Sequence, residues 1–133
     1  MKRKNIIAFF TACIMICVFT STALAAGYRM SWNGSSILGK RSIQSMRLSG
    51  NTTVKIFNNI TRARGVPNRA SATLSLQKQG AFGLWGTVYT MNQNKLGGQS
   101  WSITLESGTY SIWFSSNKIN GMTNPLDMNG NIT

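Results

Sequence analysis

The sequence contains no histidine, and only two of its 133 residues, Glu106 and Asp127, carry a carboxylate. Its two cysteines, Cys13 and Cys17, lie in an apolar run near the N-terminus, so the chain after residue 17 has neither thiol nor disulfide. Zinc, copper and thiol sites and the Ser-His-Asp triad need side chains that this part of the chain lacks. These absences argue against most enzyme classes, and we expect a protein that is not an enzyme.

Two carboxylates also leave little room for glycosidase or cation-binding chemistry. A glycosidase would have to use this one pair. Segment 124–130 is rich in oxygen donors and loosely resembles a Ca²⁺ loop, but it offers a cation only the carboxylate of Asp127. We expect Glu106 and Asp127 to serve in turns instead, and we predict neither a metal site nor a cofactor.

The first 25 residues have the order of a secretory signal peptide. Three bases at positions 2–4 precede an apolar run at 6–19, and Ala23-Leu24-Ala25 follows it, with small residues at its first and third positions. As a helix the run would span roughly 21 Å, less than the roughly 30 Å of a bilayer core, so a membrane anchor is disfavoured. We expect cleavage after Ala25 or Ala26, which leaves residues 26–133 as one secreted domain, extracellular or associated with the cell wall.

Positive charge is as abundant as negative charge is scarce. Of the 14 Lys and Arg residues, three belong to the leader, so 11 bases remain against two acids, a net charge of +9. Nine of these bases fall between residues 26 and 78, where there is no acid, whereas residues 79–133 are neutral. Such an asymmetric field attracts anions and repels cations, which favours an anionic partner.

Helical patterns are nearly absent, whereas alternation of apolar and polar residues is frequent. Turns rich in glycine and asparagine separate the alternating runs. Seven short strands arranged in this way predict an all-β fold, a small antiparallel β-sandwich of jelly-roll or Ig-like type, with a closed β-barrel as the alternative. The expected strands are residues 28–32, 43–48, 53–57, 72–77, 84–91, 101–105 and 110–115, and the tail 120–133 should end as a loop and a last short strand.

Arginines gather in the turn at residues 62–69. Arg62, Arg64 and Arg69 flank a Gly-Val-Pro-Asn segment, and guanidinium groups suit phosphate and carboxylate as bidentate donors. The alternative is a solvated loop whose charge serves only solubility. Further bases at Lys40, Arg41 and Arg47 are candidates for extending the same patch.

Four tryptophans are many for so small a domain, and indole rings beside cations suit sugars and anionic polymers. Trp101 alternates in step with Ile103 and Leu105, which predicts a core position. Trp113 alternates against its apolar neighbours, which predicts exposure, and within 84–91 the same pattern places Trp85 on one face with residues 87, 89 and 91. The candidate binding residues are therefore Lys40, Arg41, Arg47, Arg62, Arg64, Arg69, Trp85 and Trp113.

Two kinds of sequence motif match known site signatures but do not predict a functional site here. Residues 34–40 match a phosphate-binding loop, but Arg41 stands where that loop needs a Ser or Thr to hold Mg²⁺, and no helix is expected to follow. We therefore expect a basic turn between strands and no nucleotide. Two Ser-x-x-Lys matches, at 75–78 and 115–118, lie on strand-like segments, where residues three apart point to opposite faces, so neither predicts an acyl-enzyme site.

These patterns together predict a secreted, cationic β-sandwich that binds an anionic surface or polymer, such as cell wall, acidic polysaccharide or extracellular DNA. The alternative is a bacteriocin-like or membrane-active secreted toxin, drawn by the same charge to an anionic membrane surface. A secreted protein partner is a further alternative that the sequence does not separate from the first.

The leader gives the first testable prediction. The exported protein should begin at Ala26 or Gly27 when its N-terminus is sequenced, because the small residues Ala23 and Ala25 fit a signal peptidase site. Recovery of an intact form that starts at Met1 and stays in the membrane would contradict it.

Overall fold

The computed structural model describes residues 29–133, and the predicted leader lies outside the described residues. The described chain forms nine strands and one short 3-10 turn. In chain order these are β1 (Met30–Ile37), β2 (Gly39–Arg41), β3 (Met46–Leu48), β4 (Thr52–Ala63), β5 (Ala72–Gln79), η1 (Ala81–Gly83), β6 (Trp85–Gln93), β7 (Gly97–Leu105), β8 (Gly108–Ser116) and β9 (Leu126–Ile132).

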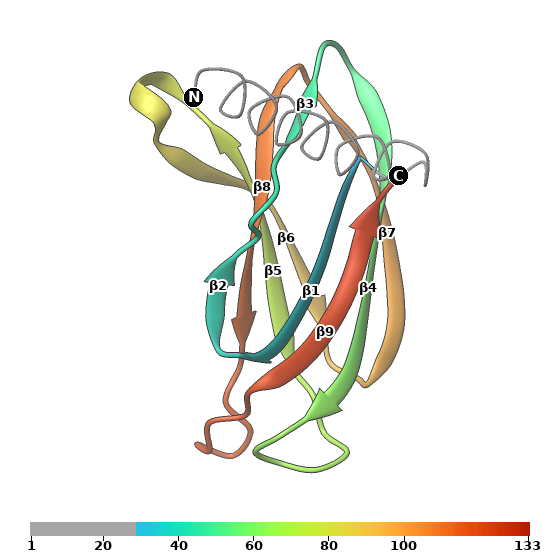
Figure 1. The fold of residues 1–133 in the computed structure, drawn as a ribbon, viewed down its shortest axis with the longest axis vertical. Helices are drawn as coiled ribbons and strands as arrows, with labels where there is room; N and C mark the ends of the chain where they lie inside the picture. Colours follow the sequence, from blue (N-terminus) through green and yellow to red (C-terminus); the bar gives the residue numbers. More distant parts are fainter. Residues whose placement is uncertain (1–28) are drawn as a thin grey trace, which may run out of the picture.

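The strands form two antiparallel sheets that pack face to face (Figure 1). Sheet 1 has the order β1-β9-β4-β7, and sheet 2 has the order β2-β8-β5-β6, with the short β3 also paired to β8. If β3 is set aside, the first strand pairs with the last, the second with the seventh, the third with the sixth and the fourth with the fifth. That is the order of a jelly roll, a long hairpin wrapped on itself.

The predicted β-sandwich is confirmed, and within residues 29–133 the two sheets share no strand pairing, so the closed barrel is wrong. Six of the seven expected strands lie mostly within observed strands. The exception is 43–48, of which only residues 46–48 form a strand, β3. The segment predicted as a basic turn, residues 34–40, instead continues β1 and forms part of β2, so only Leu38 separates the two strands. β4 is longer than expected, because its alternation persists through asparagines that a hydrophobicity pattern does not count.

Alternation of side chains across each strand builds the core. β4, β5 and β8 bury every second residue, and these inner faces meet between the sheets. Burying this apolar surface is the main favourable term for folding, since the described residues have no disulfide to add. The largest fully buried apolar side chains are Met30, Ile56, Ile60, Leu74, Leu76, Met91, Tyr110, Ile112, Leu126, Met128 and Ile132.

A bulge in β6 corrects the predicted facing of that strand. Leu76 pairs with Tyr89, but the next residue, Gln77, pairs with Thr87, so Val88 is the extra residue. The bulge turns Tyr89 and Met91 toward the inner side while it leaves Trp85 and Thr87 on the outer face of sheet 2. The single face predicted for residues 85, 87, 89 and 91 is therefore wrong.

A hydrogen-bond network crosses the core between the two sheets. Asn58 of β4 and Gln93 of β6 are both fully buried, and the Asn58 Nδ2 donates to Gln93 Oε1 at 2.9 Å. The indole Nε1 of Trp32 donates to Asn58 Oδ1 at 2.9 Å, and Gln93 Nε2 donates to the carbonyls of Lys95 and Gly97. Since every member is satisfied, the network fixes the register of one sheet on the other without leaving a buried polar group unpaired.

This network gives the second prediction. Asn58→Ala should lower the free energy of unfolding by about 2–4 kcal/mol, because it leaves the buried Gln93 Oε1 without a donor and the Trp32 indole N–H without an acceptor. The matched control is Asn59→Ala on the outer face of the same strand, which should change it by less than about 0.5 kcal/mol. Urea denaturation of both variants measures the difference, and equal effects would show that the network does not hold the sheets together.

Candidate functional site

Both carboxylates of the described chain are used in ion pairs. Arg64 Nε lies 2.7 Å from Asp127 Oδ1, and Arg64 Nη2 donates to Asp127 Oδ2 at 2.8 Å. The second pair is looser, with Lys78 Nζ at 3.4 Å from Glu106 Oε2. Within residues 29–133 the other nine Lys and Arg residues make no ion pair, so the field of the domain stays strongly positive.

One end of the sandwich collects a group of cations that we call the basic loop end. It comprises the β4–β5, β6–β7 and β8–β9 loops, which meet at the lower end of the molecule in Figure 1. Ser71 hydrogen-bonds to Asn94 and Asn117, so the three loops are tied to one another. The bases of these loops and of the adjoining end of β4 are Arg62, Arg64, Arg69, Lys95 and Lys118.

The β4–β5 loop is held rigidly by residues far away in the sequence. The buried side chain of Asn124 accepts from the backbone N–H groups of Gly65 and Val66 and donates to the carbonyl of Arg69. At Gly65 a β-carbon would collide with the carbonyl oxygen of Thr123, so only glycine fits there. The arginine turn is therefore a fixed loop, and Arg64 serves to hold it.

Asp127 does not lie in a turn, as the sequence predicted, but in β9 at the edge of this loop. Its carboxylate accepts from Arg64 and from the backbone N–H of Ser36 at 2.7 Å. The hydrogen bond from the Arg64 guanidinium, and then that from Ser36, lower the pKa of Asp127 below its usual value. Glu106 does lie in a turn, between β7 and β8, as expected.

The outer face of sheet 2 brings tryptophan and arginine together, and we call it the tryptophan face. Strand register and alternation place five residues on it. Arg41 pairs with Trp113, Arg47 pairs with Thr109 on the same side of β8, and Gln79 pairs with Trp85. Gln77 lies on β5, between β8 and β6, and pairs with Ser111 of β8. The tryptophan face is therefore defined by Arg41, Arg47, Gln77, Trp85 and Trp113.

Arg41 organises this face. Its guanidinium carbon lies 5.0 Å from the centroid of the Trp85 ring, within cation–π range, and its Nη2 donates to Gln77 Oε1 at 2.7 Å. To reach these partners the side chain extends from β2 past β8, where the residue facing Gln77 is the small Ser111. Its Nε is buried and has no hydrogen-bond partner among the described residues.

Trp113 presents an accessible ring beside Arg41. Its side chain is 39% exposed, as the alternation predicted, and it lies against Gly39, where a β-carbon would sit 3.3 Å from the indole Cζ2. A side chain at residue 39 would therefore force the indole ring to shift by a few tenths of an ångström. Neither carboxylate of the described chain lies on this face, since Glu106 and Asp127 both sit at the ends of the sandwich.

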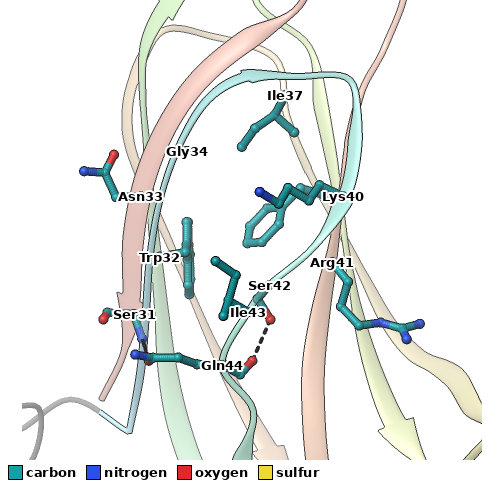
Figure 2. A pocket seen from close by; sticks show the side chains of 11 residues that line it. Ser31, Trp32, Asn33, Gly34, Ile37, Lys40, Arg41, Ser42, Ile43 and Gln44 are labelled. Carbon is teal, nitrogen blue, oxygen red and sulfur yellow. Dashed lines mark hydrogen bonds between the residues drawn. The ribbon is translucent and has the colours of Figure 1, made fainter. Parts of the chain in front are cut away.

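Lys40 points to the other side of β2, toward a cavity of about 330 Å³ between the free edges of β1 and β2 (Figure 2). The floor is aromatic, with the Trp32 and Phe114 ring centroids 5.2 Å apart. Figure 2 shows Lys40 directed across the opening and Arg41 directed away from it. Positive charge therefore continues from the tryptophan face around the edge of sheet 2.

The predicted binding residues thus fall into three places. Arg41, Arg47, Trp85 and Trp113 share the tryptophan face, Lys40 borders the neighbouring cavity, and the three arginines of the 62–69 turn lie at the basic loop end. Sequence reasoning missed Gln77, whose alternation with Leu76 marked it as outward, and the contribution of Lys95 and Lys118, each of which follows an asparagine in a turn. Among residues 29–133 no three metal-ligating side chains gather, and no helix is long and apolar enough to span a membrane.

The chain matches no protein-family model and no curated protein sequence. Among solved structures it is similar to a chain of the cowpea mosaic virus top component, described as naturally occurring empty particles. The identity is 12%, the TM-score is 0.38, and the match covers 62% of this chain and 53% of the viral chain. The chain therefore spans about half the length of that protein, and a likeness of this degree carries no argument about function.

The Arg64–Asp127 pair gives the third prediction. Because folding lowers the pKa of Asp127, its contribution to stability is present above the unfolded pKa of about 4 and is lost as pH falls through the lower folded pKa. Asp127→Asn should therefore melt below wild type at pH 7, and the gap should narrow as the pH falls below about 4. Thermal melts across this range measure it, and a gap that stays constant with pH would contradict the assignment.

Proposed function

We propose that this protein is a secreted, non-catalytic binding protein that holds an acidic polysaccharide on the tryptophan face. The observation that carries the proposal is the Arg41 guanidinium, which has no carboxylate partner, stacks near Trp85 and adjoins the accessible ring of Trp113. A cation beside two indoles is unusual in a surface that serves solubility alone, because solubility needs charge and not aromatic area.

An acidic sugar offers complementary chemistry to each part of this face. The apolar face of a pyranose ring fits an exposed indole such as Trp113, and a carboxylate or sulfate on the ring accepts hydrogen bonds from the guanidinium of Arg41. Gln77 fixes the guanidinium in place, so little side-chain entropy is lost when the ligand binds. Arg47 on the same face and Lys40 around the edge of β2 add attraction along a polymer chain.

The basic loop end supports binding by charge and lacks the aromatic component. The large apolar side chain exposed there is Met122, and no exposed indole lies in its loops. It attracts any polyanion through the field of the whole domain, and such attraction is screened by salt. Binding at the two surfaces should therefore respond differently to salt. At high salt, stacking and hydrogen bonds on the tryptophan face persist, whereas the long-range attraction of the basic loop end fades.

The fourth prediction compares the two surfaces at equal net charge. Arg41→Gln with Arg47→Gln should weaken binding to polygalacturonate by about tenfold or more, the loss that roughly 1.4 kcal/mol produces. The matched control, Arg62→Gln with Arg69→Gln, removes the same charge from the basic loop end and should have a smaller effect that disappears at high salt. Calorimetric titration at low and high salt measures both.

A tryptophan variant separates site binding from general charge attraction. Trp113→Ala keeps every charge, and it should still weaken polygalacturonate binding by about tenfold at both salt concentrations. Neutral dextran should bind weakly to all forms, and duplex DNA should bind with a steeper loss of affinity in salt, of about 0.9 in log–log slope per phosphate contact. The proposed site would be refuted if Trp113→Ala bound polygalacturonate as tightly as wild type. It would also be refuted if the two double arginine variants lost the same amount of affinity.

A further inference from the structure

The loop that joins β5 to β6 exposes large apolar side chains at its tip. We call residues 80–84 the hairpin tip. Phe82 is 99% exposed and Leu84 is 71% exposed, so neither contributes to the core. In Figure 1 this hairpin bends away from the body of the two sheets at the upper left. Exposed apolar side chains grouped on a projection mark an interaction surface more often than an accident of folding.

Exposed apolar side chains also follow the tip along β6, on both faces of that strand. The exposed large hydrophobic residues of the described chain number eight, and four of them, Phe82, Leu84, Val88 and Tyr89, fall within eight residues of sequence. From residue 79 to residue 94 the chain has no charged side chain, in a protein otherwise rich in bases. A free edge strand of this kind is usually protected by charge, and here it is not.

The backbone of the tip holds Phe82 outward in a fixed conformation. Gly80 N donates to Leu84 O at 2.7 Å and closes the loop. Phe82 has φ 60 and Gly83 has φ 74, so two successive residues adopt the left-handed region. Glycine enters that region freely, whereas phenylalanine does so at a cost. The stability of the fold gains nothing from phenylalanine at position 82, because the side chain is exposed and the backbone conformation is unfavourable for it. We therefore expect Phe82 to serve an interaction and not the fold.

Two cations border the apolar surface, namely Arg41 and Lys78, of which Lys78 also lies 3.4 Å from Glu106 Oε2. A hollow of about 600 Å³ at the base of the tip is lined by Leu84, Trp85 and Val88, with Lys78 on its border. Arg41 reaches Trp85 from the other side. A second copy of this chain would bring the same cations face to face, whereas an anionic lipid surface would neutralise them. An indole at the boundary between apolar tip and cations also suits the headgroup level of a bilayer.

We propose that the hairpin tip inserts into the interface of an anionic lipid bilayer, with Phe82 and Leu84 among the acyl chains and Lys78 and Arg41 at the phosphates. This inference goes beyond polysaccharide binding. It shares Arg41 with the tryptophan face, but it rests on the apolar side chains of the tip, which take no part in the polysaccharide site. The domain would bind the membrane surface peripherally, since apolar burial and charge attraction each supply part of the affinity.

Vesicle binding of a tip variant tests the proposal. In Phe82→Gly with Leu84→Ala, glycine accepts the positive φ, so the melting temperature should match that of wild type within a few degrees. Binding to vesicles of phosphatidylcholine and phosphatidylglycerol at 3:1 should fall about tenfold or more. The matched control is Ile43→Ala with Met122→Ala, which removes two exposed apolar side chains elsewhere and should bind within about twofold of wild type.

A second measurement reports insertion directly. Phe82→Trp places an indole at the tip, and lipids brominated in the acyl chain should quench its fluorescence beyond the quenching seen for wild type. Wild type should not bind vesicles of phosphatidylcholine alone with comparable affinity, because the electrostatic part of the attraction is then missing. Polygalacturonate binding by the tip variant should equal that of wild type, which keeps this test separate from that of the tryptophan face.

Three results would overturn the inference. The first is wild type that fails to bind the anionic vesicles, and the second is a tip variant that binds them as wild type does. The third is a wild-type dimer that becomes a monomer in the tip variant by light scattering, which would show that a second copy covers the tip.

Discussion

The hydrogen bond between Asn58 and Gln93 is the contact from which the position of the candidate site follows. It joins β4 in sheet 1 to β6 in sheet 2 in a core that no disulfide braces within the described residues. With Gln93 fixed on the inner side, Met91 and Tyr89 also face inward, and the bulge at Val88 then turns Trp85 outward. The buried amide pair and the bulge together set the facing of Trp85 and its contact with Arg41.

The shortage of carboxylates shapes the surface in a similar way. Asp127 is used to hold Arg64 and the β4–β5 loop, and Glu106 lies against Lys78 at the opposite end. No acid is left to neutralise the tryptophan face, so Arg41 interacts with an indole and an amide. The same shortage leaves Arg41 without an acid at the base of the uncharged hairpin tip, which combines apolar area with attraction to anions.

Alternation in the sequence was enough to predict a sandwich and the exposure of Trp113, because these depend on neighbours two residues away. Trp101, predicted in the core, is partly buried and packs against it. It failed where the structure depends on distant contacts. The bulge opposite Gln77 reversed the predicted facing of Tyr89, and Asp127 pairs with Arg64, 63 residues away. The side chain of Arg41 extends from β2 past β8 to Gln77 of β5 and Trp85 of β6, so it links four strands, and no local pattern specifies this path.

Indole N–H resonances of the tryptophans offer the most direct test of the central claim, that the tryptophan face binds an acidic polysaccharide. On titration with polygalacturonate fragments, the signals of Trp85 and Trp113 should shift strongly. The signal of Trp32, whose indole N–H is bonded to Asn58 in the core, should stay in place. Backbone shifts confined to Gly65, Lys95 and Lys118, with both face tryptophans unchanged, would place binding at the basic loop end and contradict the account.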